Sequence, residues 1–295
     1  MTAPALEDRE FLTVRELAEL LRLKERKVYA LAASGEVPCS RATGKLLFPA
    51  DEVRQWIERT KSGGSADMVD RPLIALGSHD PLLDWAIRES GCGLATYFDG
   101  SQDGLDRFVR AEGILTGLHI YDAKSGSWNV QAVSDAAADQ NAVLVSFVKR
   151  SRGLILQPDG ARPRSLSDLA GLRVAPRQDG SGTAGLFHAL AAESGLDLST
   201  VRFTDIARTE DEAAQSVRRD EADATMGLEA VALAFGLAFV PLIDEEFSLL
   251  VDRKAWFEPA FQTFLAFTAT DRFCQRVKSC GGYDISNIHT AQWNA

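Results

Sequence analysis

Three short apolar segments in this sequence each run directly into a turn rich in Gly, Ser or Asp and then into a segment with helical periodicity. The expected strands are residues 73–76, 94–98 and 172–175. Strands that alternate with helices in this way are typical of a parallel α/β sheet. The first N–H groups of such helices have no partner within the helix, and the carboxyl ends of parallel strands share one edge of the sheet. The pattern therefore predicts a site for a negatively charged ligand group at that edge.

A Gly- and Ser-rich stretch divides the chain into two parts of different charge. Residues 1–61 carry 11 Lys and Arg against 10 Asp and Glu, a net charge of +1, so the remainder carries −11 of the total of −10. An acidic body argues against one large nucleic-acid surface, but the first part carries local basic clusters. We expect a DNA-binding domain at residues 1–61, a flexible linker at 62–70 and a ligand-binding domain at 71–295.

The first part has the pattern of a helix-turn-helix. Thr13 followed three residues later by Glu16 forms a capping box, which predicts the start of a helix. A second helix is expected at residues 24–34, and a hairpin at 37–48 precedes a third helix. Two short helices joined by a tight turn would place the second helix in the major groove of DNA.

The segment TVRELAELLRLKERKVYALAASGEVPCSRATGKLLFPADEVRQWI closely resembles the excisionase-like winged-helix family, which is related to the DNA-binding domain of mercury-resistance regulators. The resemblance implies that the second helix and the wing contact double-stranded DNA. The corresponding residues here are Arg26, Lys27, Tyr29, Arg41, Thr43 and Lys45. The alternative is a protein-binding module whose basic residues are merely solvated.

The second part is expected to form two lobes. The apolar run at residues 143–148 could cross from one lobe to the other, and the runs at 237–242 and 247–251 could form the return crossing. A ligand in the cleft between such lobes would close it by a hinge motion. Residues 271–295 read as a final helix and a polar tail. The predicted lobes are residues 71–148 with 247–295 for lobe one, and residues 149–246 for lobe two.

Six ordered motifs strengthen the two-lobed prediction. They are GSHDPLLDWA, GSQDGLDRF, GLHIYDAKSGSWNVQAV, RSRGLILQ, GSGTAGLFHALAAESGL and ATMGLEAVALAFGLAFVPLIDEEFSLLV. Together they resemble the cytosolic periplasmic-binding-protein-like domain that is often fused to a helix-turn-helix, a family related to molybdate- and tungstate-binding proteins. The resemblance implies a type II binding-protein fold. The ligand contacts that it implies are Ser78, His79, Ser101, His119, Asp122, Asn129, Ser181, Gly182, Thr183, Gly227 and Glu229.

The chain departs from this family at the GSGT motif. Relatives commonly have Arg directly after the motif and a basic or neutral residue before it, whereas this chain has Ala184 and Asp179. Arg177 is a candidate replacement, because a guanidinium group suits a tetrahedral anion. The ligand class therefore stays open between an oxyanion such as molybdate or tungstate and a small zwitterionic or sulfonate metabolite. Aromatic residues that could hold a cationic group are Tyr97, Tyr121 and Trp128.

We expect a one-component transcriptional regulator that binds DNA as a homodimer and responds to a small molecule. The alternative is a ligand storage or delivery protein, or an enzyme of cofactor assembly, whose first domain docks a protein. No GxSxG, HExxH or GxxxxGK[ST] motif is present, so we predict no enzyme activity, no cofactor and no metal site. The absence of a bilayer-length apolar run and of CxxC spacing predicts a cytoplasmic protein with free thiols and no membrane partner.

Overall fold

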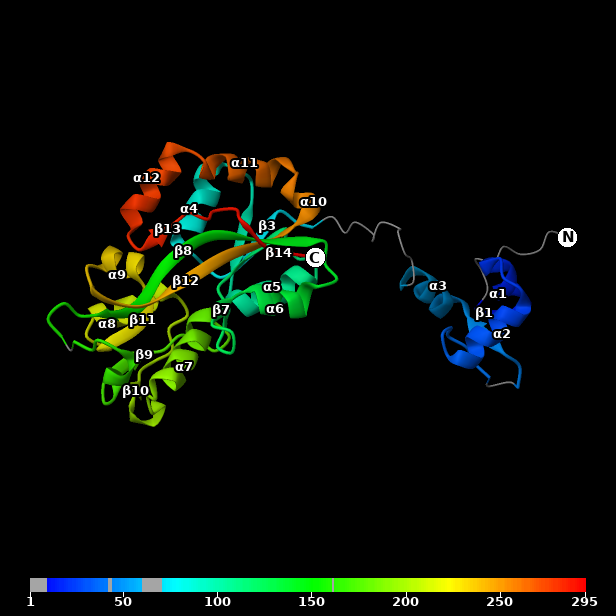
Figure 1. The fold of residues 1–295 in the computed structure, drawn as a ribbon, viewed down its shortest axis with the longest axis horizontal. Coiled ribbons are helices and arrows are strands. Elements are labelled where there is room, and N and C mark those ends of the chain that lie inside the picture. Colours follow the sequence, from blue (N-terminus) through cyan, green and yellow to red (C-terminus); the bar gives the residue numbers. More distant parts are fainter. Residues whose placement is uncertain (1–9, 42–43, 60–70, 161) are drawn as a thin grey trace. The chain divides into compact units, whose positions relative to one another are not determined.

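The computed structural model describes the chain except for residues 1–9, 42–43, 60–70 and 161. Contacts divide the chain into two units, Met1–Met68 and Val69–Ala295, coloured from blue to red along the sequence in Figure 1. Among the described residues, no helix is long and apolar enough to cross a lipid bilayer.

The N-terminal unit packs three helices and a small antiparallel sheet around one apolar core. The elements are β1 (Phe11–Thr13), α1 (Val14–Leu21), α2 (Glu25–Ser34), β2 (Leu47–Pro49) and α3 (Ala50–Arg59). The predicted capping box is confirmed, since Thr13 Oγ1 accepts from the Glu16 N–H and the Glu16 carboxylate accepts from the Thr13 N–H. β1 pairs with β2, and Ser40 pairs with Leu47 to form the base of the wing. Leu17, Val28 and Phe48 are fully buried in the core.

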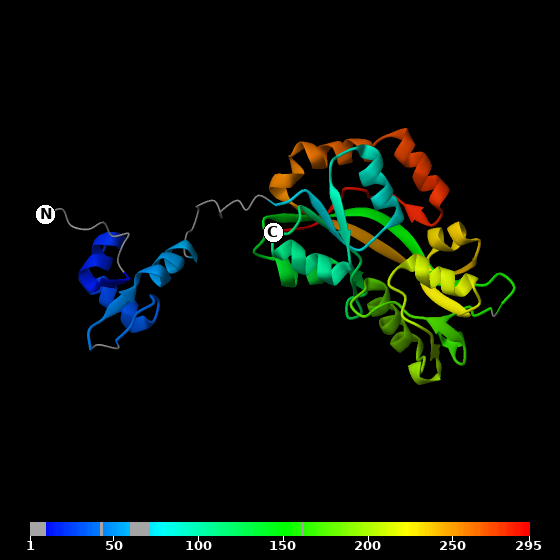
Figure 2. The same ribbon diagram turned by 180° about the vertical axis from the view of Figure 1, so that it is seen from behind.

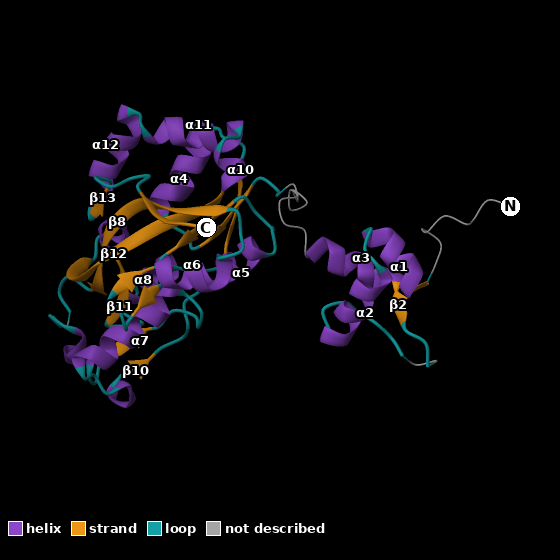
Figure 3. Cartoon of the chain, turned by 45° about the vertical axis from the view of Figure 1, so that its right-hand side comes forward, coloured by secondary structure: helices purple, strands orange, loops and turns teal. Residues whose placement is uncertain are grey.

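The C-terminal unit is built on a ten-stranded mixed sheet, seen within the described residues, with helices on its faces (Figure 3). Its main strand order is β10-β9-β11-β8-β12-β5-β3-β4, and β13 and β14 also pair with β8. A separate hairpin is made of β6 and β7. The strands are β3 (Ile74–Gly77), β4 (Ala95–Phe98), β5 (Leu115–Leu118), β6 (Tyr121–Asp122), β7 (Ser127–Trp128), β8 (Ala142–Leu156), β9 (Arg173–Ala175), β10 (Arg202–Phe203), β11 (Ala224–Leu228), β12 (Ala238–Asp252), β13 (Tyr283–Asp284) and β14 (Ala291–Asn294).

Two long antiparallel strands, β8 and β12, run side by side through the whole unit (Figures 1 and 2). The parallel strands β3, β4 and β5 lie at one end of the pair, and β9, β10 and β11 lie at the other. We call the two ends lobe one and lobe two. The α-helices of lobe one are α4 (Pro81–Ser90), α5 (Ser101–Val109), α6 (Val130–Ala137), α10 (Arg253–Trp256), α11 (Pro259–Thr268) and α12 (Asp271–Cys280). Those of lobe two are α7 (Gly182–Ser194), α8 (Glu210–Arg218) and α9 (Glu229–Phe235).

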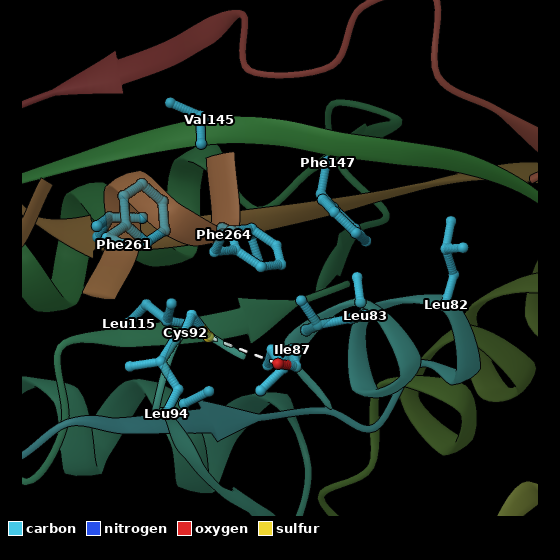
Figure 4. Packing of buried hydrophobic residues seen from close by; sticks show 14 of the residues in the cluster. Leu82, Leu83, Ile87, Cys92, Leu94, Leu115, Val145, Phe147, Phe261 and Phe264 are labelled. Atoms are coloured by element: carbon cyan, nitrogen blue, oxygen red, sulfur yellow. Dashed lines mark hydrogen bonds between the residues drawn. The ribbon is translucent and has the colours of Figure 1, made fainter. Parts of the chain in front are cut away.

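Each lobe has its own apolar core. In lobe one, four phenylalanines from β8, α11 and α12 pack with leucines of α4 beneath the sheet (Figure 4). The buried Cys92 Sγ donates to the Ile87 carbonyl at 3.6 Å in the same core. The corresponding core of lobe two lies between α7 and the sheet and includes Leu154, Leu186 and Met226.

The structure differs from the predictions made from the sequence in two places. Residues 143–148 and 154–156 are parts of one fifteen-residue strand, and the two runs of the return crossing are likewise one strand. The prediction of a polar tail after the final helix is wrong, because β13 and β14 add to β8 and Trp293 packs against the core of lobe one. The final helix itself is present as α12.

Phe147→Ala is expected to lower the free energy of unfolding by about 3–5 kcal/mol, because it leaves a cavity among three other aromatic rings. Chemical denaturation followed by circular dichroism measures the change. Phe257, which is 78% exposed, is the matched control, and Phe257→Ala should stay within about 0.5 kcal/mol of wild type. Equal effects of the two substitutions would contradict the assignment of Phe147 to the core.

Candidate functional site

A small polar pocket, here called the cleft pocket, lies between the two lobes and has a volume of about 70 Å³. Its walls come from the turns that precede α4, α5, α7 and α8, so residues far apart in the sequence meet there. The lining residues are Ser78, His79, Phe98, Asp99, Gly100, His119, Arg177, Gln178, Ser181, Thr183, Arg208, Thr209 and Glu210.

The starts of α5 and α7 face each other across this pocket with little side-chain bulk between them. Gly100 is the N-cap of α5, has φ of 110° and provides no side-chain cap. A Cβ on Gly100 would lie 3.5 Å from the Gly180 carbonyl oxygen, and a Cβ on Gly182 would lie 2.5 Å from the His119 ring. Glycine at these positions therefore permits the backbones of the two lobes to approach closely, and it leaves first-turn N–H groups near the pocket.

A chain of hydrogen bonds holds the lobe-one side of the pocket. Ser78 Oγ and Ser101 Oγ are 2.8 Å apart, and Ser101 Oγ accepts from the His119 N–H at 3.0 Å. His119 Nδ1 lies 3.0 Å from a Glu245 carboxylate oxygen, and Phe247 stacks on the His119 ring. The side chains of Ser78 and His119 are thus fixed before any ligand binds.

Beneath the pocket, the two crossing strands carry a buried ion-pair network. Glu245 on β12 contacts both Arg150 and Arg152 on β8, and all three side chains have at most 1% exposure. Arg150 also pairs with Asp80 at 2.7 Å, which is the N-cap of α4 in lobe one. Arg152 pairs with Glu210 at 2.8 Å, the first residue of α8 in lobe two. The network therefore joins both lobes to the strands between them.

Arg152 also reaches the pocket wall directly. It donates through Nη1 to Thr183 Oγ1 at 2.9 Å, and Thr183 Oγ1 lies 3.2 Å from Glu210. Arg177 is held to the backbone of the same lobe, because it donates to the carbonyls of Ala207 and Arg208.

The network shifts the pKa values of its members in different directions. Burial lowers the pKa of His119 despite the neighbouring Glu245, so the imidazole is neutral at pH 7. Burial alone would raise the pKa of Glu245, but Arg150 and Arg152 hold it well below its ordinary range. Burial would also raise the pKa of Glu210, but Arg152, Arg150 and Arg177 together lower it to about 2. Burial lowers the pKa of Arg177.

Six of the residues predicted from the sequence as ligand contacts line the cleft pocket. They are Ser78, His79, His119, Arg177, Ser181 and Thr183. Two others lie directly behind the wall, since Ser101 bonds to Ser78 and Gly182 abuts the His119 ring. Asn129, by contrast, is buried and holds the backbone, because it accepts from the Ile120 N–H and donates to Ser248 and to the Glu246 carbonyl.

The remaining candidates lie elsewhere in the unit. Glu229 at the start of α9 lies beside Gly281 and Gly282 and does not line the cleft pocket. Asp122 bonds to Lys124 and Ser125 within its own turn. The aromatic candidates are placed away from the pocket: Tyr121 packs on Trp128, and Tyr97 packs against Arg107.

Sequence reasoning missed the charged network. Arg150, Arg152 and Glu245 interrupt the apolar runs SFVKRSRGLIL and DEEFSLLV, and three charges within two buried strands are a signal that could have found them. Asp80 and Glu210 carry no such signal, because an acidic residue in the first turn of a helix is ordinary.

The N-terminal unit has a second candidate surface, a groove of about 590 Å³ between α2 and the wing. Tyr29, Arg41 and Lys45 line it, and the exposed Arg26 and Lys27 lie on the same helix as Tyr29. Among the described residues, none forms an ion pair with these four cations. Thr43 lies outside the described residues.

The low pKa of Glu210 predicts a pH effect on stability. A carboxyl group whose pKa is about 2 in the folded state and about 4.5 when unfolded stabilises the fold fully above pH 4.5 and loses that contribution as the pH falls towards 2. Glu210→Gln is therefore expected to flatten the dependence of unfolding free energy on pH within this window. Urea denaturation at intervals between pH 2.5 and 6 measures it, and parallel curves for wild type and variant would contradict the prediction.

Comparison with known proteins agrees with this geometry. Residues 11–61 match a helix-turn-helix domain, and residues 85–269 match the PBP (periplasmic-binding-protein) superfamily domain. The chain is 26% identical over 267 residues to a Bacillus subtilis (strain 168) protein described as uncharacterized protein YvgK, covering 82% of this chain and 85% of that one.

Solved structures are similar at the level of the fold. A putative phosphate ABC transporter substrate-binding protein from Clostridium perfringens, solved with bound phosphate, has a TM-score of 0.52 at 12% identity and covers 74% of this chain and 98% of its own. The periplasmic aliphatic sulphonate binding protein SsuA from Escherichia coli has a TM-score of 0.46 at 17% identity and covers 70% of this chain and 75% of its own. The chain belongs to the PBP superfamily and carries that domain behind an N-terminal helix-turn-helix domain.

Proposed function

We propose that the protein is a ligand-responsive transcriptional regulator that acts in the cytosol. A small molecule bound in the cleft pocket changes how the N-terminal domain binds double-stranded DNA. The observation that carries the proposal is the combination, in one chain, of a helix-turn-helix domain with exposed surface cations and a PBP-like domain whose polar pocket is lined by both lobes. The helix-turn-helix domain is of a type that binds DNA, and the PBP-like domain is of a type that binds small ligands. Neither contains a GxSxG, HExxH or GxxxxGK[ST] motif.

The ligand of the cleft pocket is proposed to be a compact oxyanion, such as molybdate or tungstate, or the sulfonate group of a small metabolite. A volume of about 70 Å³ supports a small ligand group. The hydroxyl groups of Ser78 and Ser181 and the starts of α5 and α7 offer neutral donors, whereas the hydroxyl group of Thr183 donates to Glu210.

The formal charges of the buried network support recognition by such neutral groups. Three carboxylates, Asp80, Glu210 and Glu245, are matched by three guanidinium groups, those of Arg150, Arg152 and Arg177. Because His119 is neutral, the network has no excess positive charge to offer. The two charged lining residues outside the network, Asp99 and Arg208, also have opposite signs, so hydroxyl groups, backbone amides and helix dipoles carry the recognition.

The cations of α2 and the wing support binding to DNA through phosphate and base contacts. A single short recognition helix contacts few base pairs, so we propose that the protein binds two half-sites as a homodimer.

Arg26→Ala and Lys45→Ala are expected to weaken DNA binding by about 1–3 kcal/mol each if the side chains contact a base, and to reduce the salt dependence if they contact phosphate. Fluorescence anisotropy on the DNA upstream of the gene, at several salt concentrations, measures both effects and the number of chains per site. Arg88→Ala removes an equally exposed charge from the ligand-binding domain and is the matched control. If the wild-type protein shows no preference for a DNA sequence, with or without oxyanions, the proposal that it is a transcriptional regulator is refuted.

Ser78→Ala is expected to reduce or abolish the thermal stabilisation that the ligand gives to the wild-type protein, because binding to the folded state raises stability by mass action. Thermal-shift measurements with molybdate, tungstate, sulfate, phosphate and taurine provide the test. Ser125→Ala, in the exposed turn between β6 and β7, serves as control. Stabilisation of equal size in wild type and Ser78→Ala would show that the ligand does not bind in the cleft pocket.

A further inference from the structure

A second pocket lies within lobe two, between α7 and the sheet, and is here called the α7 pocket. Its volume is about 380 Å³, which is within the range of about 300–1,000 Å³ typical of pockets for small organic ligands. It reaches the core of the lobe at Val174 and Met226 and opens to solvent beside Phe203 and Ile206, which are 44% and 63% exposed. The lining residues are Val174, Ala175, Pro176, Arg177, Asp179, Thr183, Ala184, Phe187, His188, Phe203, Thr204, Ile206 and Met226.

The walls of the α7 pocket are mainly apolar and partly aromatic. Phe187 on α7 and Phe203 on β10 meet edge to face, with ring centroids 6.1 Å apart. Such a pair presents both a ring face and a ring edge to a neighbouring aromatic group. This chemistry differs from that of the cleft pocket, where the hydroxyls of Ser78 and Ser181 are part of the wall.

One polar group in this mainly apolar wall, the hydroxyl of Thr204, makes no hydrogen bond within the described part of the chain. Thr204 Oγ1 is buried and has no hydrogen-bond partner among the described residues. A buried hydroxyl without a partner costs free energy, and nearly all such groups in folded proteins are satisfied by protein, water or ligand. Thr204 lines the α7 pocket, so a group bound there can supply the missing partner.

We propose that the α7 pocket is a second ligand site, which binds a small organic molecule with an aromatic or branched aliphatic body and one oxygen-bearing group. The body packs against Phe187, Phe203 and Met226, and the oxygen-bearing group hydrogen bonds to Thr204 Oγ1. This site goes beyond the proposed sensing of a compact anion, because its size and its walls select a different class of molecule.

The site is tested on the full chain with 8-anilinonaphthalene-1-sulfonate, whose fluorescence rises on entering an apolar pocket. Wild-type protein is expected to bind one molecule per chain. Ile206→Asp places a negative charge at the mouth of the pocket and is expected to raise the Kd about tenfold or more, because the charge resists burial under the probe and repels its sulfonate group. Leu233→Asp changes a similarly exposed apolar residue on α9, outside the pocket, and should leave the Kd unchanged.

The role of Thr204 is tested by competition. In the wild-type protein, 2-naphthol should displace the probe at lower concentration than naphthalene does, and Thr204→Val should remove this difference while leaving the displacement by naphthalene unchanged. Melting curves confirm that each variant is folded. An unchanged Kd in Ile206→Asp, an equal loss in Leu233→Asp, or no preference for 2-naphthol in wild type would overturn the proposal. None of these readouts depends on DNA or on the cleft ligand, so their failure leaves the regulator unaffected.

Discussion

The buried carboxylate of Glu245, held between Arg150 and Arg152, is the interaction on which the rest of the ligand-binding domain depends. Removing three charges from water costs several kcal/mol for each ion, and good geometry must offset that cost. The register of β8 against β12 places Glu245 directly opposite Arg150, and a slip by one residue would turn Glu245 to the other face of the sheet. The ion pairs therefore fix how the two crossing strands align, and through Asp80 and Glu210 they fix where α4 and α8 begin.

The same network determines what kind of chemistry the cleft pocket can perform. Its guanidinium groups are engaged by carboxylates or by backbone carbonyls, so they orient the wall of the pocket through Thr183 and His119. The pocket is lined by hydroxyls, imidazoles, the starts of helices and the charged side chains of Asp99, Arg177, Arg208 and Glu210.

The sequence predicted the architecture well because local signals and the global fold agree. The capping box at Thr13, the end of the second helix at Ser34 and the strand-turn-helix units of lobe one all appear where the pattern placed them. The network was not predicted, since its ion pairs join distant parts of the sequence. Arg150 is 95 residues from Glu245 and 70 residues from Asp80, and these residues meet only in the folded chain. Asn129 was expected at the ligand for its place in a motif, but its amide is used to hold the backbone of Ile120. The role of the last residues was missed because a two-residue strand such as β13 leaves no periodicity to detect.

The irregular pairing of the two crossing strands has a mechanical consequence. The register shifts between Pro241 and Ile243 and again between Phe247 and Ser248, so an irregularity lies on each side of Glu245. Interrupted ladders bend more easily than continuous ones, whereas the segment between them is clamped by ions. If one lobe rotates against the other, we expect the strands to bend at these two points. In such a rotation Glu245, which lies between the two irregularities, stays in place while the two lobes move on either side of the cleft pocket.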